Sequence, residues 1–174
     1  MFYHMNVRSI TNLDLDKVLE IYYKIENKTP ACTLEGWTLG EVRERLSGWL
    51  TSDNHISLLC EKSGETVAFL FCRTDPPHLA TVEIFCQSLD YDPEDEQTPQ
   101  MAEDSVFPHF AENIVSPTNL IFTELARELK PRGIQTVNLL VNKKHHNIRL
   151  FSRFLEYGGF NKGSEFIEYE MDLD

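Results

Sequence analysis

The last quarter of the chain holds the pattern that most limits its fold. Residues 134–141 (IQTVNLLV) are mostly apolar and predict a buried strand, and the polar turn KKHHN leads into apolar residues at helical spacing. Gly158 and Gly159 mark the end of this helix. Residues 166–173 are then predicted to form a half-buried strand, because from Ile167 on the side chains alternate between apolar and acidic. A strand, a helix and a second strand in direct succession indicate an α/β fold.

Three further helices are predicted from their start signals. One of them runs from Pro117, because proline fits the first helical position, to the Pro-Arg-Gly at 131–133. The other two cover apolar positions at helical spacing in residues 15–25 and 39–50. Each follows a capping box, in which a threonine precedes an acidic residue by three positions: Thr11 with Asp14, and Thr38 with Glu41.

Strand-like runs occupy residues 5–11, 56–62, 66–74 and 79–89. The turn residues 63–65 join the second run to the third, and a Pro-Pro pair separates the third from the fourth. Because these connections are short, the last three runs are expected to pair as an antiparallel meander. There is no internal repeat, so residues 1–174 are predicted to form one domain.

The charge is strongly acidic and unevenly distributed. The formal net charge is −12, and residues 90–104 contain seven acidic residues and no basic one. This balance argues against nonspecific nucleic-acid binding, which needs Lys and Arg on the phosphates. It favours a cationic partner, although a solvated loop explains such a run equally simply. We treat residues 90–115 as an acidic insertion. No apolar run reaches the roughly 20 residues of a membrane helix, and cytoplasmic residence is expected.

The four cysteines are far apart in the sequence. Cys60, Cys72 and Cys86 lie within apolar strand-like runs, and Cys32 lies in a turn-rich stretch. Without a C-x-x-C pair, they are expected to be reduced thiols that pack as small hydrophobes. The adjacent His145 and His146 have no ligand partner at metal-site spacing, so no metal is predicted.

The order of these elements resembles the GNAT acetyltransferase superfamily. The resemblance covers nearly the whole chain and is strongest in KPRGIQTVNLLVNKKHHNIRLFSRFLEYGGF, which is similar to the family's helix, Arg-Gly, strand, Asn, helix, Gly-Phe run. It implies a mixed, mostly antiparallel sheet flanked by about four helices. It also implies acetyl-coenzyme A as a co-substrate, bound beside the closing strand-helix-strand unit.

The resemblance implies a catalytic carboxylate at Glu83. In the histone-acetylating branch of the family, a glutamate on the matching strand takes a proton from an ammonium, directly or through water, so that the free amine can attack the thioester. The competing interpretation is an outward-facing glutamate on a half-exposed strand. In simple alternation, Glu83 shares its side with Thr81 and Phe85, opposite a core face of Val82, Ile84 and Cys86.

The segment matching the family's pyrophosphate loop departs from the family pattern. The family places two glycines before the third helix, where close backbone approach and the helix N-terminus favour phosphate. Here those positions fall on Ser116 and Thr118, and the intervening Pro117 has no N–H to donate. Ser116, Thr118 and Asn119 are therefore the candidate coenzyme ligands. Ordinary helix capping explains these three residues at least as well.

The last helix carries the remaining site residues that the resemblance implies. Asn147 matches the family asparagine that holds the pantetheine arm of the coenzyme. Phe154 stands where the family often has a tyrosine that protonates the leaving thiolate. Tyr157, one turn later, is the candidate replacement, and a packing aromatic with a solvated hydroxyl is the alternative.

Two functions follow from these residues. The first is an N-acetyltransferase that moves acetyl from acetyl-coenzyme A to a primary amine of a small cationic molecule or a protein. The second is a catalytically inactive GNAT-like binding or regulatory module that engages a basic partner. The strand glutamate and the turn asparagine favour the first, and the altered pyrophosphate loop favours the second. A monomer and a homodimer both agree with the sequence.

Overall fold

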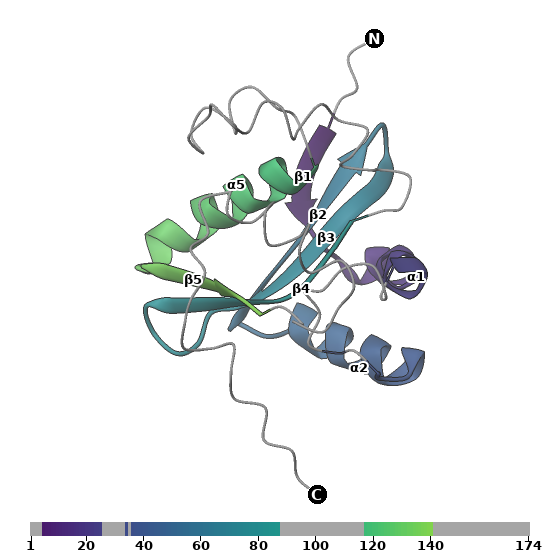
Figure 1. Ribbon diagram of the computed structural model, residues 1–174, viewed down its shortest axis with the longest axis horizontal. Helices are drawn as coiled ribbons and strands as arrows, with labels where there is room; N and C mark the ends of the chain where they lie inside the picture. Colours follow the sequence, from purple (N-terminus) through teal and green to yellow (C-terminus); the bar gives the residue numbers. More distant parts are fainter. Residues whose placement is uncertain (1–4, 26–33, 35, 88–116, 141–174) are drawn as a thin grey trace, which may run out of the picture.

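A five-stranded sheet organises the molecule, with helices on both of its faces (Figure 1). The computed structural model describes residues 5–25, 34, 36–87 and 117–140. The strands are β1 (Met5–Ser9), β2 (His55–Lys62), β3 (Glu65–Arg73), β4 (Leu79–Gln87) and β5 (Thr136–Leu139). The helices are α1 (Leu15–Ile25), α2 (Leu39–Leu50) and α5 (Pro117–Leu129), with short 3-10 turns at Asn12–Asp14 and Lys130–Arg132.

The strand order is β1-β2-β3-β4-β5, antiparallel from β1 to β4 and parallel between β4 and β5. The predicted meander is therefore confirmed. The β2–β3 connection is a two-residue hairpin loop, in which Lys62 pairs with Glu65 and both Ser63 (φ 52°) and Gly64 (φ 83°) have positive φ. Positive φ at both central positions gives the turn the twist of the flanking strands. The expected last helix, the final strand and the acidic insertion fall outside the described residues.

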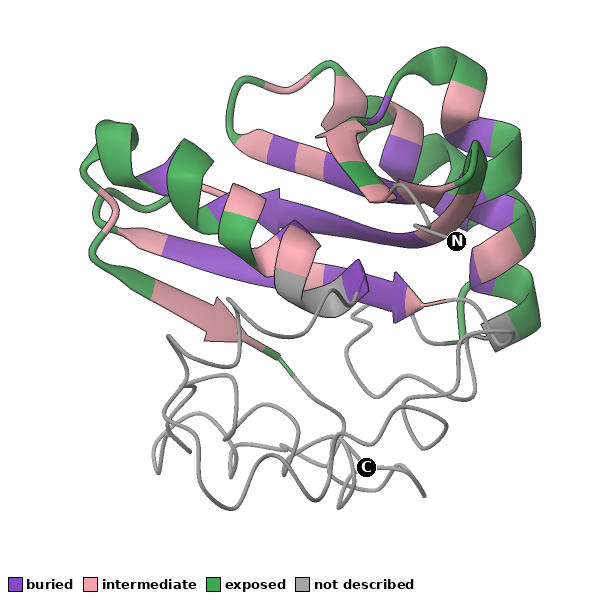
Figure 2. Cartoon of the chain, turned by 90° about the horizontal axis from the view of Figure 1, so that it is seen from above, coloured by how far each residue is buried: buried purple, intermediate pink, exposed green. Residues whose placement is uncertain are grey.

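Each face of the sheet has its own apolar core. On one face, α1 and α2 pack against Leu59, Phe69, Phe71, Ile84 and Cys86. On the other, Ile121, Leu125 and Leu129 of α5 cover a second set of strand residues. This second set comprises Ile56, Leu58, Cys60, Ala68, Leu70, Cys72, Ala80, Val82 and Phe85. Figure 2 shows the buried residues of both cores concentrated in the central strands and on the helix faces turned toward them.

A β-bulge in β4 corrects the predicted faces of that strand. Phe71 of β3 pairs with Ile84 and Cys72 pairs with Val82, so Glu83 is the extra residue. The bulge interrupts the alternation of side chains. Val82 and Phe85 consequently belong to the core under α5, whereas Ile84 belongs to the core under α1 and α2. The predictions that Val82, Ile84 and Cys86 share one face, and that Glu83 and Phe85 share the other, are both wrong.

Both predicted capping boxes are present at the helix starts. Asp14 accepts hydrogen bonds from the Thr11 backbone N–H (2.8 Å) and hydroxyl (3.0 Å). Glu41 accepts from the Thr38 backbone N–H (2.7 Å) and hydroxyl (2.8 Å). Such bonds satisfy donors that a helix start leaves without partners.

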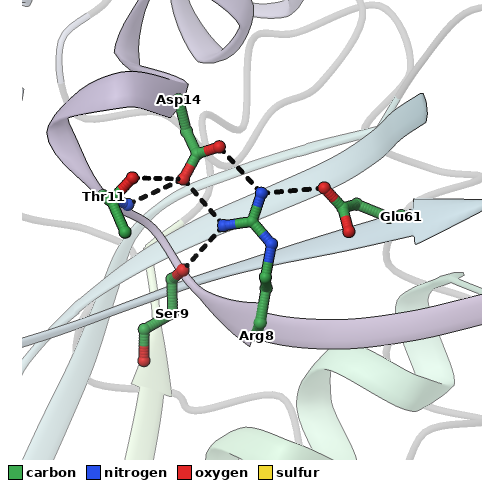
Figure 3. Close-up of polar contacts among 5 residues, drawn as sticks. All are labelled: Arg8, Ser9, Thr11, Asp14 and Glu61. Atoms are coloured by element: carbon green, nitrogen blue, oxygen red, sulfur yellow. Dashed lines mark hydrogen bonds and ion pairs between the residues drawn. The ribbon is translucent and has the colours of Figure 1, made fainter. Parts of the chain in front are cut away.

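Asp14 is also the centre of an ion-pair network, which Figure 3 shows. The guanidinium of Arg8 donates to both oxygens of Asp14 at 2.8 Å and to Oε1 of Glu61 at 2.8 Å. We name Arg8, Thr11, Asp14 and Glu61 the Arg8 cluster. It connects β1, β2 and the turn that begins α1 on the surface of the molecule.

The end of α5 also matches the sequence prediction. Gly133 has a left-handed φ of 73° and its N–H donates to the carbonyl of Lys130. A glycine adopts this conformation without strain. His78, in the β3–β4 loop, holds the chain that follows. Its carbonyl accepts from the N–H groups of Gln135 and Thr136, and its Nδ1 lies 3.2 Å from the Gly133 carbonyl.

Candidate functional site

Glu83 lies at the centre of a polar cluster on the face of the sheet that α1 and α2 cover. Its side chain is only 12% exposed, so the outward-facing, half-exposed interpretation is wrong. Glu83 Oε2 lies 3.7 Å from Nε2 of His55, at the start of β2. Glu83 Oε1 lies 3.6 Å from Nη1 of Arg73, at the end of β3. We name His55, Arg73 and Glu83 the Glu83 cluster.

The strand registers bring these three residues together. His55 and Arg73 are directly opposite each other in the β2–β3 pair, and β3 pairs in turn with β4. The bulge in β4 lets Glu83 lie on the same face as Ile84, beside the two basic side chains. The three neighbouring strands are visible in Figure 1. One residue from each strand therefore contributes to the cluster.

His55 is held on its other sides by α2 and by the turn that follows it. The ring of Trp49 stacks on the imidazole with centroids 5.1 Å apart and planes 16° apart. Trp49 in turn contacts Phe71 of β3, with centroids 5.6 Å apart. The second ring nitrogen, Nδ1, lies 3.1 Å from Oγ of Ser52. The imidazole is therefore fixed by stacking and by a polar contact at Nδ1.

The side chains of the Glu83 cluster are close together but are not hydrogen-bonded to one another. Among the described residues, His55 Nε2, Arg73 Nε and Glu83 Oε2 are buried side-chain atoms without a hydrogen-bond partner. Arg73 Nε does lie 3.4 Å from Oδ1 of Asp75, as an ion pair. Buried polar atoms without partners are uncommon and are often found at sites that act on a ligand. A carboxylate side chain of this kind can act as a general base for a bound ligand.

The sequence predicts Glu83 as a site residue but does not indicate its two neighbours, His55 and Arg73, or Trp49, which stacks on His55. The signal that connects His55, Arg73 and Glu83 is the strand register. A bulge in each of the β2–β3 and β3–β4 pairs shifts that register, so counting from the hairpin turn does not align the three residues.

Two of the four predicted coenzyme ligands, Ser116 and Asn147, lie outside the described residues. Tyr157, the candidate acid, and Phe154 lie outside them as well. Thr118 and Asn119 are in the first turn of α5, where the structure describes only their backbone, and Pro117 is the first residue of that helix, as predicted. Their roles as coenzyme ligands stay predictions.

Glu83 directly follows the last residue of β4 that pairs with β5 among the described residues. Within the described residues, β4 pairs with β5 from Leu79 to Val82, and Glu83 is the next residue. From there to Gln87, β4 pairs with β3 alone in the part of the chain that the structure describes.

The described cysteines are structural in character. Cys60, Cys72 and Cys86 are all buried free thiols. Burial raises the pKa of the Cys60 thiol to about 11 and that of the Cys72 thiol to about 12. A thiol that stays protonated is a poor nucleophile and metal ligand. The described residues contain no group of three or more His, Cys, Asp or Glu side chains that could hold a metal ion. None of the described helices has the length and apolar character needed to cross a membrane.

Several solved structures with the same fold are acetyltransferases. An aminoglycoside N-acetyltransferase in complex with coenzyme A is similar over 99% of this chain and 98% of its own, with 10% identity and a TM-score of 0.66. A GNAT family acetyltransferase of Staphylococcus aureus is similar over 96% of this chain and 98% of its own, with 10% identity and a TM-score of 0.55. The ribosomal-protein-S18-alanine N-acetyltransferase of Escherichia coli covers 92% of this chain with 80% of its own, at 15% identity and a TM-score of 0.54.

No protein-family model matches the sequence, and no curated protein matches it. At identities this low, the likeness to solved structures concerns the fold. The GNAT fold expected from the order of elements is therefore confirmed.

Proposed function

We propose that this chain, which has the GNAT fold, is an N-acetyltransferase that moves acetyl from acetyl-coenzyme A to a primary amine. One observation carries the proposal. A bulge in β4 lets the Glu83 carboxylate, which is only 12% exposed, face His55 and Arg73 from the two neighbouring strands. The acceptor class that we favour is a small cationic molecule or a basic protein, because the chain carries a formal net charge of −12.

The proposed reaction uses Glu83 as a general base. A carboxylate oxygen of Glu83 takes a proton from the acceptor ammonium, and the pair of electrons in that N–H bond becomes the lone pair of a free amine. The amine attacks the acetyl carbonyl carbon, the bond from that carbon to sulfur breaks, and the nitrogen releases its second proton to solvent to give the neutral amide. Coenzyme A leaves as the thiolate, and Tyr157 is the candidate that protonates it and is itself reprotonated from solvent. A positioned base of this kind contributes roughly 100-fold or more to the rate.

The start of α5 is the proposed binding place for the coenzyme phosphates. The first N–H groups of a helix have no partner within it, and they carry partial positive charge toward an anion. Thr118 and Asn119 supply such groups, whereas Pro117 supplies none. Ser116 and Asn147 complete the proposed coenzyme contacts. These donors suit a phosphate. Because proline has no N–H, they are one fewer than they would be with any other residue at position 117.

Coenzyme binding is the experiment that tests the proposal. Acetyl-coenzyme A should raise the melting temperature as its concentration passes the dissociation constant, with about 2.7 kcal/mol of stabilisation at 100 times that constant. Thr118→Asp adds a negative charge in the first turn of α5 and should weaken this shift. Thr123→Asp, at an exposed position further along the same helix, is the matched control and should keep it. No shift and no calorimetric heat at millimolar ligand would refute the proposal.

A second candidate function is the inactive binding module that engages a basic partner. Arg73 favours it, because a guanidinium 3.6 Å from Glu83 offers the carboxylate a structural ion-pair partner. In that case a cationic peptide should bind while acetyl-coenzyme A causes no thermal shift. Binding of both, with release of free coenzyme A thiol, is expected only of the enzyme.

A further inference from the structure

The two ring nitrogens of His55 face different groups, Ser52 at Nδ1 and Glu83 at Nε2. Ser52 Oγ accepts a hydrogen bond from the backbone N–H of Asn54 at 3.2 Å. In the tautomer on which the inference below rests, Ser52 donates its own proton to Nδ1 of His55, 3.1 Å away. The imidazole proton is then on Nε2, which faces Glu83 Oε2 at 3.7 Å.

The charged neighbours are consistent with this assignment. The groups that face His55 are Glu83 from β4 and, across the β2–β3 pair, Arg73. Arg73 is engaged with Glu83 Oε1 and with Asp75, so the carboxylate oxygen nearest His55 is Oε2. Trp49 stacks on the ring from α2 and keeps its plane fixed. The imidazole is only 10% exposed.

We infer that His55 is a positioning residue for Glu83, which fixes the carboxylate for the proton transfer through Nε2–H and Oε2. This inference rests on the proposed function. The 3.7 Å separation is longer than a hydrogen bond, and contacts of this kind often tighten only when substrates bind. Preorientation by a second residue that is itself held by packing is how a rigid site keeps a base aligned.

Kinetics with matched variants tests the inference. The probes are acetyl-coenzyme A with three acceptors: an aminoglycoside, spermidine and a peptide with a free N-terminal alanine. Release of free thiol reports turnover. His55→Leu should lower kcat about 10- to 100-fold, the usual effect of losing an orienting partner, with KM for acetyl-coenzyme A unchanged. His55→Gln keeps an N–H near the position of Nε2 and should recover most of kcat. His78→Asn, at an exposed loop histidine, should leave kcat unchanged.

A double-mutant cycle separates positioning from a general structural effect. If His55 acts through Glu83, then His55→Leu should lower the residual rate less than about twofold in a Glu83→Gln background. Equal losses in both backgrounds, or full activity of His55→Leu, would overturn the inference while leaving the proposed function in place. A wild-type protein that neither binds acetyl-coenzyme A nor releases thiol with any acceptor would remove the proposed function and the inference together.

A measurement without an acceptor keeps the inference testable if His55→Leu fails to fold. Long-range ¹⁵N–¹H spectra of the histidine rings report which nitrogen carries the proton. Glu83→Gln should change the Nε2 signal of His55 and leave the signals of His78 unchanged. Identical His55 signals in wild type and Glu83→Gln would show that the two side chains do not interact, and the inference would be wrong.

Discussion

The two polar clusters on the sheet are similar in burial and different in pairing. In the Arg8 cluster the arginine side chain is 37% exposed and Asp14 15%, while in the Glu83 cluster Arg73 is 42% exposed and Glu83 12%. Yet Arg8 makes three carboxylate hydrogen bonds at 2.8 Å, whereas the contacts of Glu83 are 3.6 and 3.7 Å long. Burial alone therefore does not distinguish them.

The difference teaches what each cluster is suited to do. The polar groups of the Arg8 cluster are satisfied within the protein, and the cluster connects β1, β2 and the start of α1 (Figure 3). Its contribution is to stability. The Glu83 cluster leaves buried polar atoms of His55, Arg73 and Glu83 without hydrogen bonds among the described residues. Such groups cost free energy unless a ligand pairs with them, which is the usual condition of a binding or catalytic site.

The largest expected effect is on turnover, from Glu83→Gln. The amide keeps the size of the side chain but cannot accept the proton, so kcat should fall by about 100-fold or more. Affinity for acetyl-coenzyme A and the free energy of unfolding should change little, because the contacts of Glu83 are long. Steady-state kinetics, calorimetry and urea unfolding measure the three quantities. A large loss of stability with unchanged turnover would make the Glu83 cluster a structural ion-pair cluster like that of Arg8.

Asp14→Ala should have the opposite effect to Glu83→Gln: it should lower stability and leave turnover unchanged. It removes two hydrogen bonds to Arg8 and two from Thr11, and loss of a cap and its charged bonds typically costs about 2 kcal/mol. Urea unfolding should show this loss, while kcat stays at the wild-type value. Asp16→Ala is the matched control, because Asp16 pairs with Arg43 at an 84% exposed position. That change should stay within about 0.5 kcal/mol. Equal losses of stability in Asp14→Ala and Asp16→Ala would show that the Arg8 cluster contributes no more than an exposed ion pair.

The comparison also explains what the sequence could predict. The capping boxes at Thr11 and Thr38, the hairpin at Ser63 and the left-handed Gly133 that closes the turn after α5 are local, so neighbouring residues specify them. Glu83 was found through the resemblance to a family. Its partners were not found, because their meeting depends on bulges that shift two strand registers, and no glycine marks either bulge. Local chemistry is readable from the sequence here, whereas a cluster contributed by three strands is not.

The dependence of stability on pH should also show the contribution of Asp14 to the Arg8 cluster. Hydrogen bonds from Arg8 hold the pKa of Asp14 well below its ordinary value. A depressed pKa means that this stabilisation is complete above the unfolded value of about 3.9 and is lost as pH falls below it. Asp14→Asn should therefore flatten the decline in the free energy of unfolding below about pH 4. Urea unfolding from pH 7 to pH 2 measures it. Parallel curves for wild type and Asp14→Asn would contradict the assignment.

The smallest expected effect is that of Glu61→Gln, which tests whether Asp14 or Glu61 is the main partner of Arg8. Glu61 makes one hydrogen bond to the guanidinium and is 22% exposed, whereas Asp14 binds both Nη atoms. The amide oxygen of glutamine still accepts that bond, so only the charge assistance is lost, about 0.5 kcal/mol in urea unfolding. Glu20→Gln is the control, because Glu20 pairs with Lys24 on the exposed side of α1. Loss of this exposed ion pair should leave the midpoint of urea unfolding unchanged. If Glu61→Gln lowers the free energy of unfolding as much as Asp14→Ala does, the main partner of Arg8 is Glu61 on β2, and not Asp14 at the helix start. The comparison with the Glu83 cluster would then be between two carboxylates on strands, one hydrogen-bonded to an arginine and one not.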